Sequence, residues 1–371
     1  MSTRRIFLAA TAAASAMHAQ QREIRVAHIG IGNRGTSLLK QVLEQRNVKV
    51  AAVCDTDAGK RDAAQSLAAR DNPKSYTEWR KVLELADVDA IFIATPCNLH
   101  APMAAAALEA GKYVYCEKPL GVEPEQVADV LKAARGAKTW LQIGQQLRYY
   151  PHIREAIRQL HDERAIGKLL VIQAQRNSTP VEPGKERERP AWYLDVKQSG
   201  NLIVENAVHN IDVCNWVARS RPVSAYGYGK KYLPVPSVPA NTNFMDGFSV
   251  SYIYENDMHL DYSQLYLHPR MMKEFRNGQW YLVFGEKGSV EINSGMVYPM
   301  WGEPRKYLGG DKNWDQLRDN ATAEFFRCIR ENEKPFADIE VAATAAITVI
   351  MGREAIYRKR MVTWKELGVD V

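Results

Sequence analysis

The sequence feature that most constrains the fold is a glycine-rich turn between a predicted strand and a predicted helix. Residues 24–29 alternate in hydrophobicity and run into Gly30-Ile31-Gly32-Asn33-Arg34-Gly35, and residues 36–45 then carry apolar side chains at helical spacing. A strand, a tight turn and a helix form the context that a dinucleotide-binding fingerprint requires. The sequence therefore predicts a Rossmann-type unit near its N-terminus.

Each glycine of this turn has its own predicted role. Gly30 allows the turn, Gly32 lets the backbone approach a pyrophosphate, and Gly35 permits close packing of helix and strand. The helix that begins around Asn33 and Arg34 supplies free N–H groups and a positive dipole to the phosphates. We expect all five residues to contact the cofactor.

A second predicted strand, residues 48–54, ends at an acidic residue, Asp55. At this distance from the glycines a carboxylate can accept hydrogen bonds from the adenosine ribose. Asp55 favours NAD over NADP, because a 2′-phosphate would meet its negative charge. The alternative is that Asp55 only forms the turn at the strand end.

A third unit repeats this rhythm. Residues 89–94 form a buried strand, a loop leads into the Ala-rich helix 101–110, and Gly111 ends that helix. Residues 112–116 form the next strand. Ligands bind at the carboxyl ends of such strands, so the loop residues there are cofactor candidates: Thr95, Pro96, Asn98, His100, Glu117 and Lys118.

The remaining chain predicts a second α/β domain over residues 146–371, after a first domain over 23–145. A helix near Ile153 is followed by strands at 169–175, 248–254, 259–265, 280–284 and 289–292, with a hairpin around 255–257, and these strands make one large sheet. Residues 233–240 hold three prolines and predict a rigid excursion from the sheet. Helices over 313–331 and 339–357 close the chain.

Five stretches of the sequence together resemble the Gfo/Idh/MocA oxidoreductase superfamily. They are Gly30 to Gly35, Ala94-Thr95-Pro96, Ala110-Gly111-Lys112, Glu117-Lys118-Pro119 and the later His209. The resemblance implies a Rossmann domain that holds NAD or NADP, and a C-terminal α/β domain whose large, mostly antiparallel sheet covers the nicotinamide and contributes to a homo-oligomer, a dimer or tetramer. It also implies that Lys118 lies beside the reacting carbon of a sugar-like substrate, with a cis peptide before Pro119. The alternative for Lys118 is a solvated surface lysine.

Residues 199–212 resemble the superfamily's stretch before its catalytic histidine, with two departures. Glu205 replaces the usual aspartate, and only Gly200 remains of the glycines. Glu205, His209 and Asp212 are spaced by four and three, which predicts one helical face and hydrogen bonds in series. We expect His209, titrating near neutrality, to take the substrate's proton, and Lys118, with a pKa lowered by burial and by oxidised nicotinamide, to share it.

Two other interpretations of His209 are a satisfied core histidine and a metal ligand with Glu205 and Asp212. No second histidine is nearby, so we expect no metal. Aromatic faces and amides suit a sugar pocket, although most aromatic residues of a protein this size are core. The candidates for substrate binding are Tyr149, Tyr150, Asn177, Trp192, Tyr193 and Asn206.

The N-terminus predicts export by the twin-arginine pathway. Arg4 and Arg5 precede an uncharged apolar stretch, residues 6–16, with small residues suited to cleavage after Ala16 or Ala19, so residues 1–19 are a predicted signal peptide. The alternative, a membrane-anchoring helix, falls short of the roughly 20 residues that a bilayer requires. Export of a folded protein to the periplasm, where no NAD pool exists, predicts a tightly retained cofactor.

Charge and cysteine content exclude several classes of binding partner and of stabilising cross-link. The net charge is +6, with basic residues scattered among 43 acidic ones, so nucleic acid is not an expected partner, nor is a membrane beyond the export step. Five unpaired cysteines predict buried thiols rather than a disulfide framework or a zinc site.

The sequence thus predicts an exported, NAD-retaining oxidoreductase that acts on a hydroxyl of a sugar or glycoside. It could oxidise one sugar and reduce another, or it could cleave glycosides through transient oxidation, elimination, water addition and return of the hydride. The third possibility is a sugar-binding protein with a vestigial cofactor site, which the intact Gly30, Gly32, Gly35, Lys118 and His209 disfavour.

Overall fold

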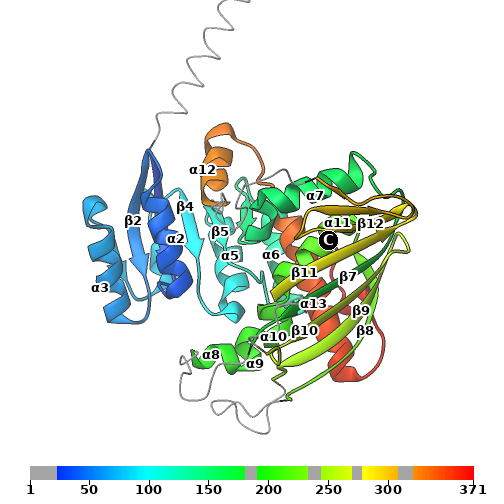
Figure 1. Cartoon of the computed structure of the whole chain (residues 1–371). Helices are drawn as coiled ribbons and strands as arrows, with labels where there is room; N and C mark the ends of the chain where they lie inside the picture. The colour runs from blue at the N-terminus through cyan, green and yellow to red at the C-terminus, as the bar shows by residue number, and fades with distance from the viewer. Residues whose placement is uncertain (1–22, 180–189, 233–243, 270–277, 308–320) are drawn as a thin grey trace, which may run out of the picture.

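The computed structural model describes residues 23–179, 190–232, 244–269, 278–307 and 321–371. Figure 1 shows two β-sheets with helices packed on them, and the chain passing from the first sheet to the second. The predicted signal segment 1–19 and the predicted excursion 233–240 lie outside the described residues. Within the described ranges, no helix is both long and apolar enough to cross a membrane.

The first sheet is parallel and has six strands in the order β3-β2-β1-β4-β5-β6. Because β4 pairs with the side of β1 opposite β2, the winding reverses between β1 and β4, and the carboxyl ends of strands at such a point are where α/β sheets bind ligands. The strands are β1 (Ile24–Ile29), β2 (Val48–Cys54), β3 (Lys74–Tyr76), β4 (Ala90–Ile93), β5 (Tyr113–Cys116) and β6 (Leu141–Ile143).

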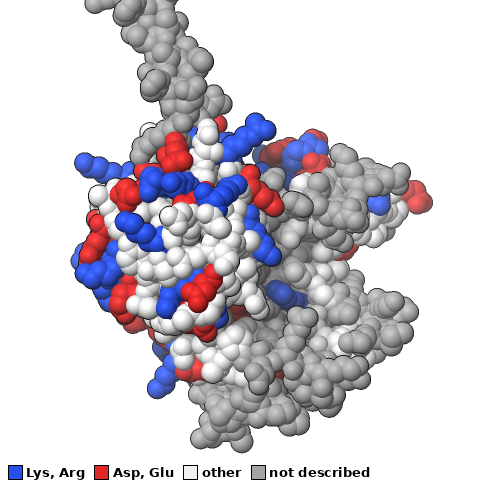
Figure 2. Space-filling view, turned by 90° about the vertical axis from the view of Figure 1, so that its left-hand side faces the viewer, with Lys and Arg blue, Asp and Glu red and all other residues white. Residues whose placement is uncertain are grey.

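Helices cover this sheet through narrow apolar faces. In the first of them Leu38, Leu39 and Val42 are fully buried against the strands. Glu123 and Gln126 form a capping box at the start of another helix, with Pro124 in its first turn. The helices are α2 (Asn33–Leu43), α3 (Ala58–Leu67), α4 (Trp79–Leu83), α5 (His100–Glu109) and α6 (Pro124–Gly136). Figure 2 shows acidic and basic side chains interspersed over this part of the surface.

The second sheet has nine strands in the order β14-β13-β12-β11-β7-β10-β9-β8-β15. All its pairings are antiparallel except that of β7 with β10. The two-sheet fold class is confirmed, but the short edge strands and β8 carry weak alternation and were not predicted. The strands are β7 (Leu169–Asn177), β8 (Pro222–Lys230), β9 (Gly247–Tyr254), β10 (His259–Leu265), β11 (Gly278–Gly285), β12 (Gly288–Glu291), β13 (Met296–Pro299), β14 (Arg305–Lys306) and β15 (Val362–Thr363).

Helices from the second half of the chain join the two sheets. Phe325 and Phe326 of α12 pack on Phe92 in β4, and the Gln142 side chain donates a hydrogen bond of 2.7 Å to the Ala321 carbonyl. The long helix α13 packs on α6 and also on β8. The bounds are α7 (Pro151–His161), α8 (Ala191–Leu194), α9 (Val196–Ser199), α10 (Asn201–Glu205), α11 (Val208–Ala218), α12 (Ala321–Glu331) and α13 (Ile339–Arg358).

Candidate active site

The glycine turn between β1 and α2 leaves open space at one position. Gly30 has a φ of +89°, and a Cβ there would lie 2.6 Å from the Ala94 carbonyl oxygen. A Cβ at Gly35 would overlap the Gly30 carbonyl, whereas nothing lies within 4 Å of the Cβ position at Gly32. The helix α2 follows Gly32 without a side-chain cap. Open space beside uncapped N–H groups suits a pyrophosphate, so these residues fit a dinucleotide.

Asp55 is held against this turn at the carboxyl end of β2. One carboxylate oxygen accepts a hydrogen bond of 2.7 Å from the Ile31 N–H, and the other accepts one of 3.0 Å from the Asp57 N–H. The carboxylate therefore shapes the turn as well as lying where the ribose contact is expected. The ribose contact itself stays a prediction.

His100 joins two loops at this edge rather than presenting a free ring. Its Nε2 lies 2.9 Å from the Thr95 carbonyl oxygen, and its Nδ1 lies 2.7 Å from that of Pro119. Burial lowers the pKa of His100, and a neutral ring can donate to only one of the two carbonyl oxygens at a time. We infer that His100 fixes the loop that carries Pro96 and Asn98, whose backbone carbonyl accepts a bond from the Gln126 side chain.

Glu117 links the glycine turn to the lysine that follows it. Arg34 donates from Nε to a Glu117 carboxylate oxygen at 2.6 Å, and the Lys118 N–H lies 3.3 Å from the other oxygen. The carboxylate occupies the space that Gly144 leaves, since a Cβ there would lie 2.7 Å from it. The Lys118–Pro119 peptide is cis, as the sequence predicts.

Lys118 forms a buried ion pair with Glu205. Its ammonium donates to a carboxylate oxygen of Glu205 and to the Glu205 carbonyl, both at 2.6 Å. Burial disfavours the ammonium, but the Glu205 carboxylate outweighs burial and raises the pKa of Lys118. Burial likewise disfavours the Glu205 carboxylate, but Lys118 outweighs it and lowers that pKa. Burial alone therefore does not lower the pKa of Lys118, because the pairing with Glu205 offsets it, and the predicted effect of oxidised nicotinamide stays a prediction.

His209 takes its orientation from an amide instead of a carboxylate. Its Nδ1 lies 3.1 Å from the Gln145 side-chain oxygen, so Nδ1 donates and Nε2 is left as an acceptor. Burial holds the pKa of His209 well below its usual value, and the positive charges of Lys118, Arg176 and Arg34 lower it further. The prediction of titration near neutrality is wrong, because the ring is enclosed beside cations.

The predicted series of hydrogen bonds through Glu205, His209 and Asp212 is not formed. The helix is interrupted at Asn206 and Ala207, between α10 and α11, so the three residues do not share one face. Glu205 turns to Lys118, while Asp212 accepts two hydrogen bonds from Arg148, at 2.8 and 2.9 Å. Spacing along one ideal helix was the wrong geometry for this segment.

A buried polar layer faces α11 from the second sheet, and sequence patterns do not reveal most of it. Asn210 donates to the Tyr281 hydroxyl at 2.6 Å and to the Gln279 side chain at 3.2 Å, and Gln264 donates to the Asn206 side chain at 2.8 Å. Arg176 joins this layer from β7. Alternation along β7 was the available signal, because Ile172, Ala174 and Arg176 lie on one face.

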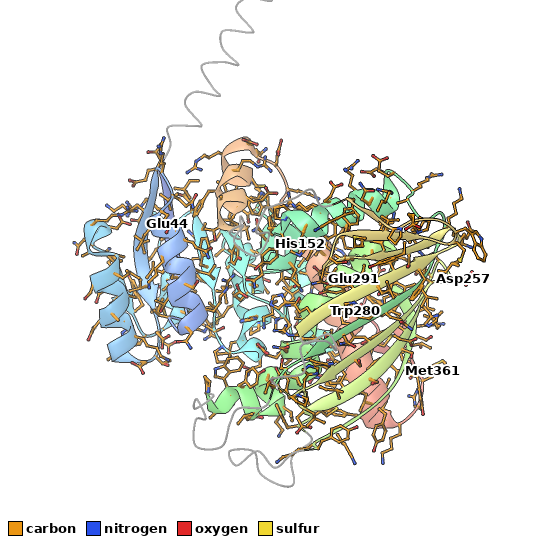
Figure 3. The ribbon with its side chains drawn as sticks, in the orientation of Figure 1. Glu44, His152, Asp257, Trp280, Glu291 and Met361 are labelled. Atoms are coloured by element: carbon orange, nitrogen blue, oxygen red, sulfur yellow. The ribbon has the colours of Figure 1, made fainter. Side chains whose placement is uncertain are left out.

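Some of the predicted substrate residues lie near the candidate site and others do not. Asn206 lies in the polar layer, and Tyr193 on α8 lies near enough to Glu205 to lower the pKa of that carboxylate. The Trp192 ring packs edge-on against Tyr193, and the Tyr150 ring lies tilted beside His152 of α7, which Figure 3 labels. Tyr149 is 2% exposed and packs on Phe336, so it is core. By alternation Asn177 points to the face of β7 opposite Arg176.

That opposite face of the second sheet carries a separate shallow hollow of about 390 Å³. Its lining includes Gln173, Ser251, Asp261 and Trp280, the last labelled in Figure 3. The catalytic candidates lie on the other side of the sheet, so this hollow is not their site. All five cysteines are buried and free, as predicted.

Family comparisons cover most of the described chain. Residues 24–145 match the model of an oxidoreductase family with an NAD-binding Rossmann fold, and residues 155–291 match that of a GFO/IDH/MocA C-terminal domain. A nicotinamide dinucleotide is therefore the cofactor class of the first domain. When bound, this group accepts and returns a hydride.

Curated relatives match over part of their length. A glycosyl hydrolase family 109 protein of Stenotrophomonas maltophilia is 34% identical over 188 residues, which are 46% of this chain and 41% of that protein. Inositol 2-dehydrogenase of Salmonella typhimurium is 31% identical over 194 residues, 51% of this chain and 53% of the enzyme. The chain thus spans about half the length of the curated relatives it matches.

Solved structures share the whole fold at low identity. The aldose-aldose oxidoreductase of Caulobacter crescentus aligns with a TM-score of 0.74 at 20% identity, covering 92% of this chain and 100% of that one. Myo-inositol 2-dehydrogenase of Lactobacillus plantarum gives 0.71 at 21% identity, with 92% and 99% covered. At these identities the likeness establishes the fold alone.

Proposed function

The chain belongs to the Gfo/Idh/MocA oxidoreductase family, and from this premise we propose that it transfers a hydride between a retained NAD and a hydroxyl of a sugar or glycoside. The observation that carries the proposal is the convergence of Lys118, Glu205 and His209, which Glu117 and Arg34 link to the open glycine turn. Charged and neutral proton-handling groups meet there at the edge where the cofactor fits.

The two catalytic residues divide the work. Oxidation of a secondary alcohol requires an acceptor for the hydroxyl proton, and the neutral Nε2 of His209 is free to accept it. The Lys118 ammonium, held by Glu205, hydrogen-bonds the same oxygen and stabilises the negative charge that develops on it. In the reverse direction His209 returns the proton.

NAD rather than NADP, and its retention, form the finer part of the proposal. The Asp55 carboxylate lies at the end of β2, where a 2′-phosphate would meet like charge. The Arg4-Arg5 signal supports export of the folded holo protein to the periplasm. A cofactor that never exchanges must be regenerated by the substrate or by a second sugar.

The glycosyl hydrolase family 109 relative favours a second candidate, redox-neutral glycoside cleavage. Oxidation of a ring hydroxyl acidifies the neighbouring C–H, so that a proton and the glycosidic substituent can leave. Water then adds to the double bond and the hydride returns to the carbonyl carbon. The balance is hydrolysis, and it uses the same two residues to move protons.

A substrate panel without added NAD tests both candidates. Purified protein is incubated with aryl glycosides, with single aldoses and with pairs of aldoses, and products are separated by chromatography. Oxidised and reduced sugars in equal amounts support sugar dismutation, and a released aryl group supports the glycosidase. Absence of any product, together with an unchanged bound cofactor, would contradict the proposed function.

A further inference from the structure

The cations around the candidate site are paired, with one exception. Lys118 is paired with Glu205 and Arg34 with Glu117, each at 2.6 Å, and behind them Arg148 is paired with Asp212 at 2.8 Å. Arg176 has no carboxylate oxygen within 4.0 Å among the described residues. Its guanidinium makes one long contact of 3.5 Å, to the side-chain oxygen of Asn210.

This unpaired guanidinium lies beside the reacting groups. Its guanidinium contacts Asn210, which follows His209 on α11, and the positive charge of Arg176 lowers the pKa values of both Glu205 and His209. In the sheet register Arg176 stands opposite Gln264 on one side and Gln279 on the other. Two amides thus flank a cation that has no carboxylate partner among the described residues.

We propose that Arg176 binds a carboxylate of the substrate, so that the enzyme acts on acid sugars such as hexuronic acids. This inference rests on the proposed function, since it names the substrate class of the same site. A planar guanidinium matches a carboxylate with two parallel hydrogen bonds. The half-buried guanidinium then gains a carboxylate partner, which no described residue supplies, while the partly exposed Gln279 amide beside it can meet a ring hydroxyl.

A carboxylate fits the site better than a phosphate ester. A dianionic phosphate is typically held by several cations or by a helix N-terminus. Here the charge of Lys118 is balanced by Glu205. Among the described residues at this place, the guanidinium of Arg176 is the one cation without a carboxylate partner. The single positive charge of Arg176 therefore matches the single negative charge of a carboxylate.

Matched sugar pairs test the inference on the holoenzyme. Dissociation constants of D-glucuronate against D-glucose, and of D-galacturonate against D-galactose, are measured by calorimetry, with glucose 6-phosphate as a third arm. We expect a uronate to bind roughly tenfold to a hundredfold more tightly than its hexose, the scale of a charged hydrogen bond. Equal affinities within both pairs, or tighter binding of the phosphate ester, would overturn the inference.

Variants locate the preference. Arg176→Gln removes the charge and keeps an amide, so the ratio of the two dissociation constants should fall to about one, and Arg176→Lys should retain part of it. Arg80→Gln, an exposed site on α4, is the matched control and should keep the wild-type ratio. A ratio that persists in Arg176→Gln contradicts the assignment. If Arg176→Gln fails to fold, the wild-type pairs still decide.

Binding and chemistry fail separately in this design. Calorimetry reports the preference without turnover, and absorbance of the bound cofactor reports hydride transfer. A uronate preference without cofactor reduction would contradict the proposed function and leave the Arg176 assignment standing. Cofactor reduction with equal affinity for hexose and uronate would support the proposed function and contradict the Arg176 assignment.

Discussion

The two walls of the candidate site are built from different parts of the chain. The cofactor wall is backbone: Gly30 and Gly35 are pressed against carbonyl groups, and Gly32 leaves an open space at the start of α2. The wall that we propose meets the substrate is made of side chains: amides of the second sheet hydrogen-bond Asn206 and Asn210, and Arg176 contacts Asn210. The first wall has no room for a side chain at Gly30 or Gly35, whereas the second wall is built from side chains.

This difference separates what stabilises the protein from what selects its substrate. Gly30 and Gly35 are required by the packing of β1, β4 and α2, so changes there affect folding and cofactor binding together. Polar side chains of the second wall can be substituted singly by residues of similar size. Substitutions should therefore act on stability at the first wall and on chemistry at the second.

The largest effect should come from the two proton-handling groups, His209 of the second wall and Lys118, which follows β5. His209→Ala should cut hydride transfer by roughly a hundredfold or more, because it removes a positioned proton acceptor. Lys118→Met alone would leave the Glu205 carboxylate buried without its partner, so Lys118→Met is best combined with Glu205→Gln. Single-turnover absorbance of the bound nicotinamide measures the rate. Wild-type rates in both variants would show that the likeness to the family is one of fold alone.

Two glycines of the first wall should respond differently. Gly35→Ala places a methyl group on the Gly30 carbonyl and should destabilise the protein by about 1–3 kcal/mol. Gly32→Ala meets no atom within 4 Å, so it should leave stability unchanged and weaken cofactor retention. Thermal unfolding and release of dinucleotide on denaturation measure the two effects. Equal losses of stability in both variants would contradict the open cradle at Gly32.

The partner of His209 offers a pH test of the second wall. Gln145→Glu places a carboxylate beside Nδ1–H and should raise the pKa of His209, because the negative charge favours the imidazolium. His209 accepts a proton when neutral, so the rate falls as pH drops through its pKa, and this acid limb should move to higher pH. Gln145→Leu, which adds no charge, should slow the reaction without that shift. An acid limb of the pH–rate profile that does not move in Gln145→Glu would show that Gln145 does not contact the proton-accepting histidine.

The smallest expected effect is on cofactor choice at Asp55. Because its carboxylate also holds the Ile31 N–H, Asp55→Asn is a better probe than Asp55→Ala: it removes the charge and retains an acceptor. We expect the preference for NAD over NADP to fall roughly tenfold, since the like-charge contact disappears. Affinities of the apo-protein for both dinucleotides provide the measurement, and an unchanged ratio would leave Asp55 as a turn residue.

The sequence predicted the first wall better than the second. Gly30 to Gly35 and Asp55 belong to one strand–turn–helix–strand motif, whose residue types and spacing can be recognised in the sequence. Lys118 and Glu205 are 87 residues apart, and their pairing depends on how the two units pack. The interruption between α10 and α11 turned Glu205 away from His209, which helical spacing could not reveal. Gln145 and Arg176 needed the strand register to be recognised.

The most direct test of the account is a spectrum of the purified mature protein mixed with sugar and no added cofactor. The account predicts that dinucleotide is released on denaturation, and that a substrate of the correct class generates the absorbance band of reduced nicotinamide within one turnover. The band should disappear when a second, oxidised sugar is added. A bound dinucleotide that no sugar or glycoside reduces, in protein that is otherwise folded, would contradict the central claim.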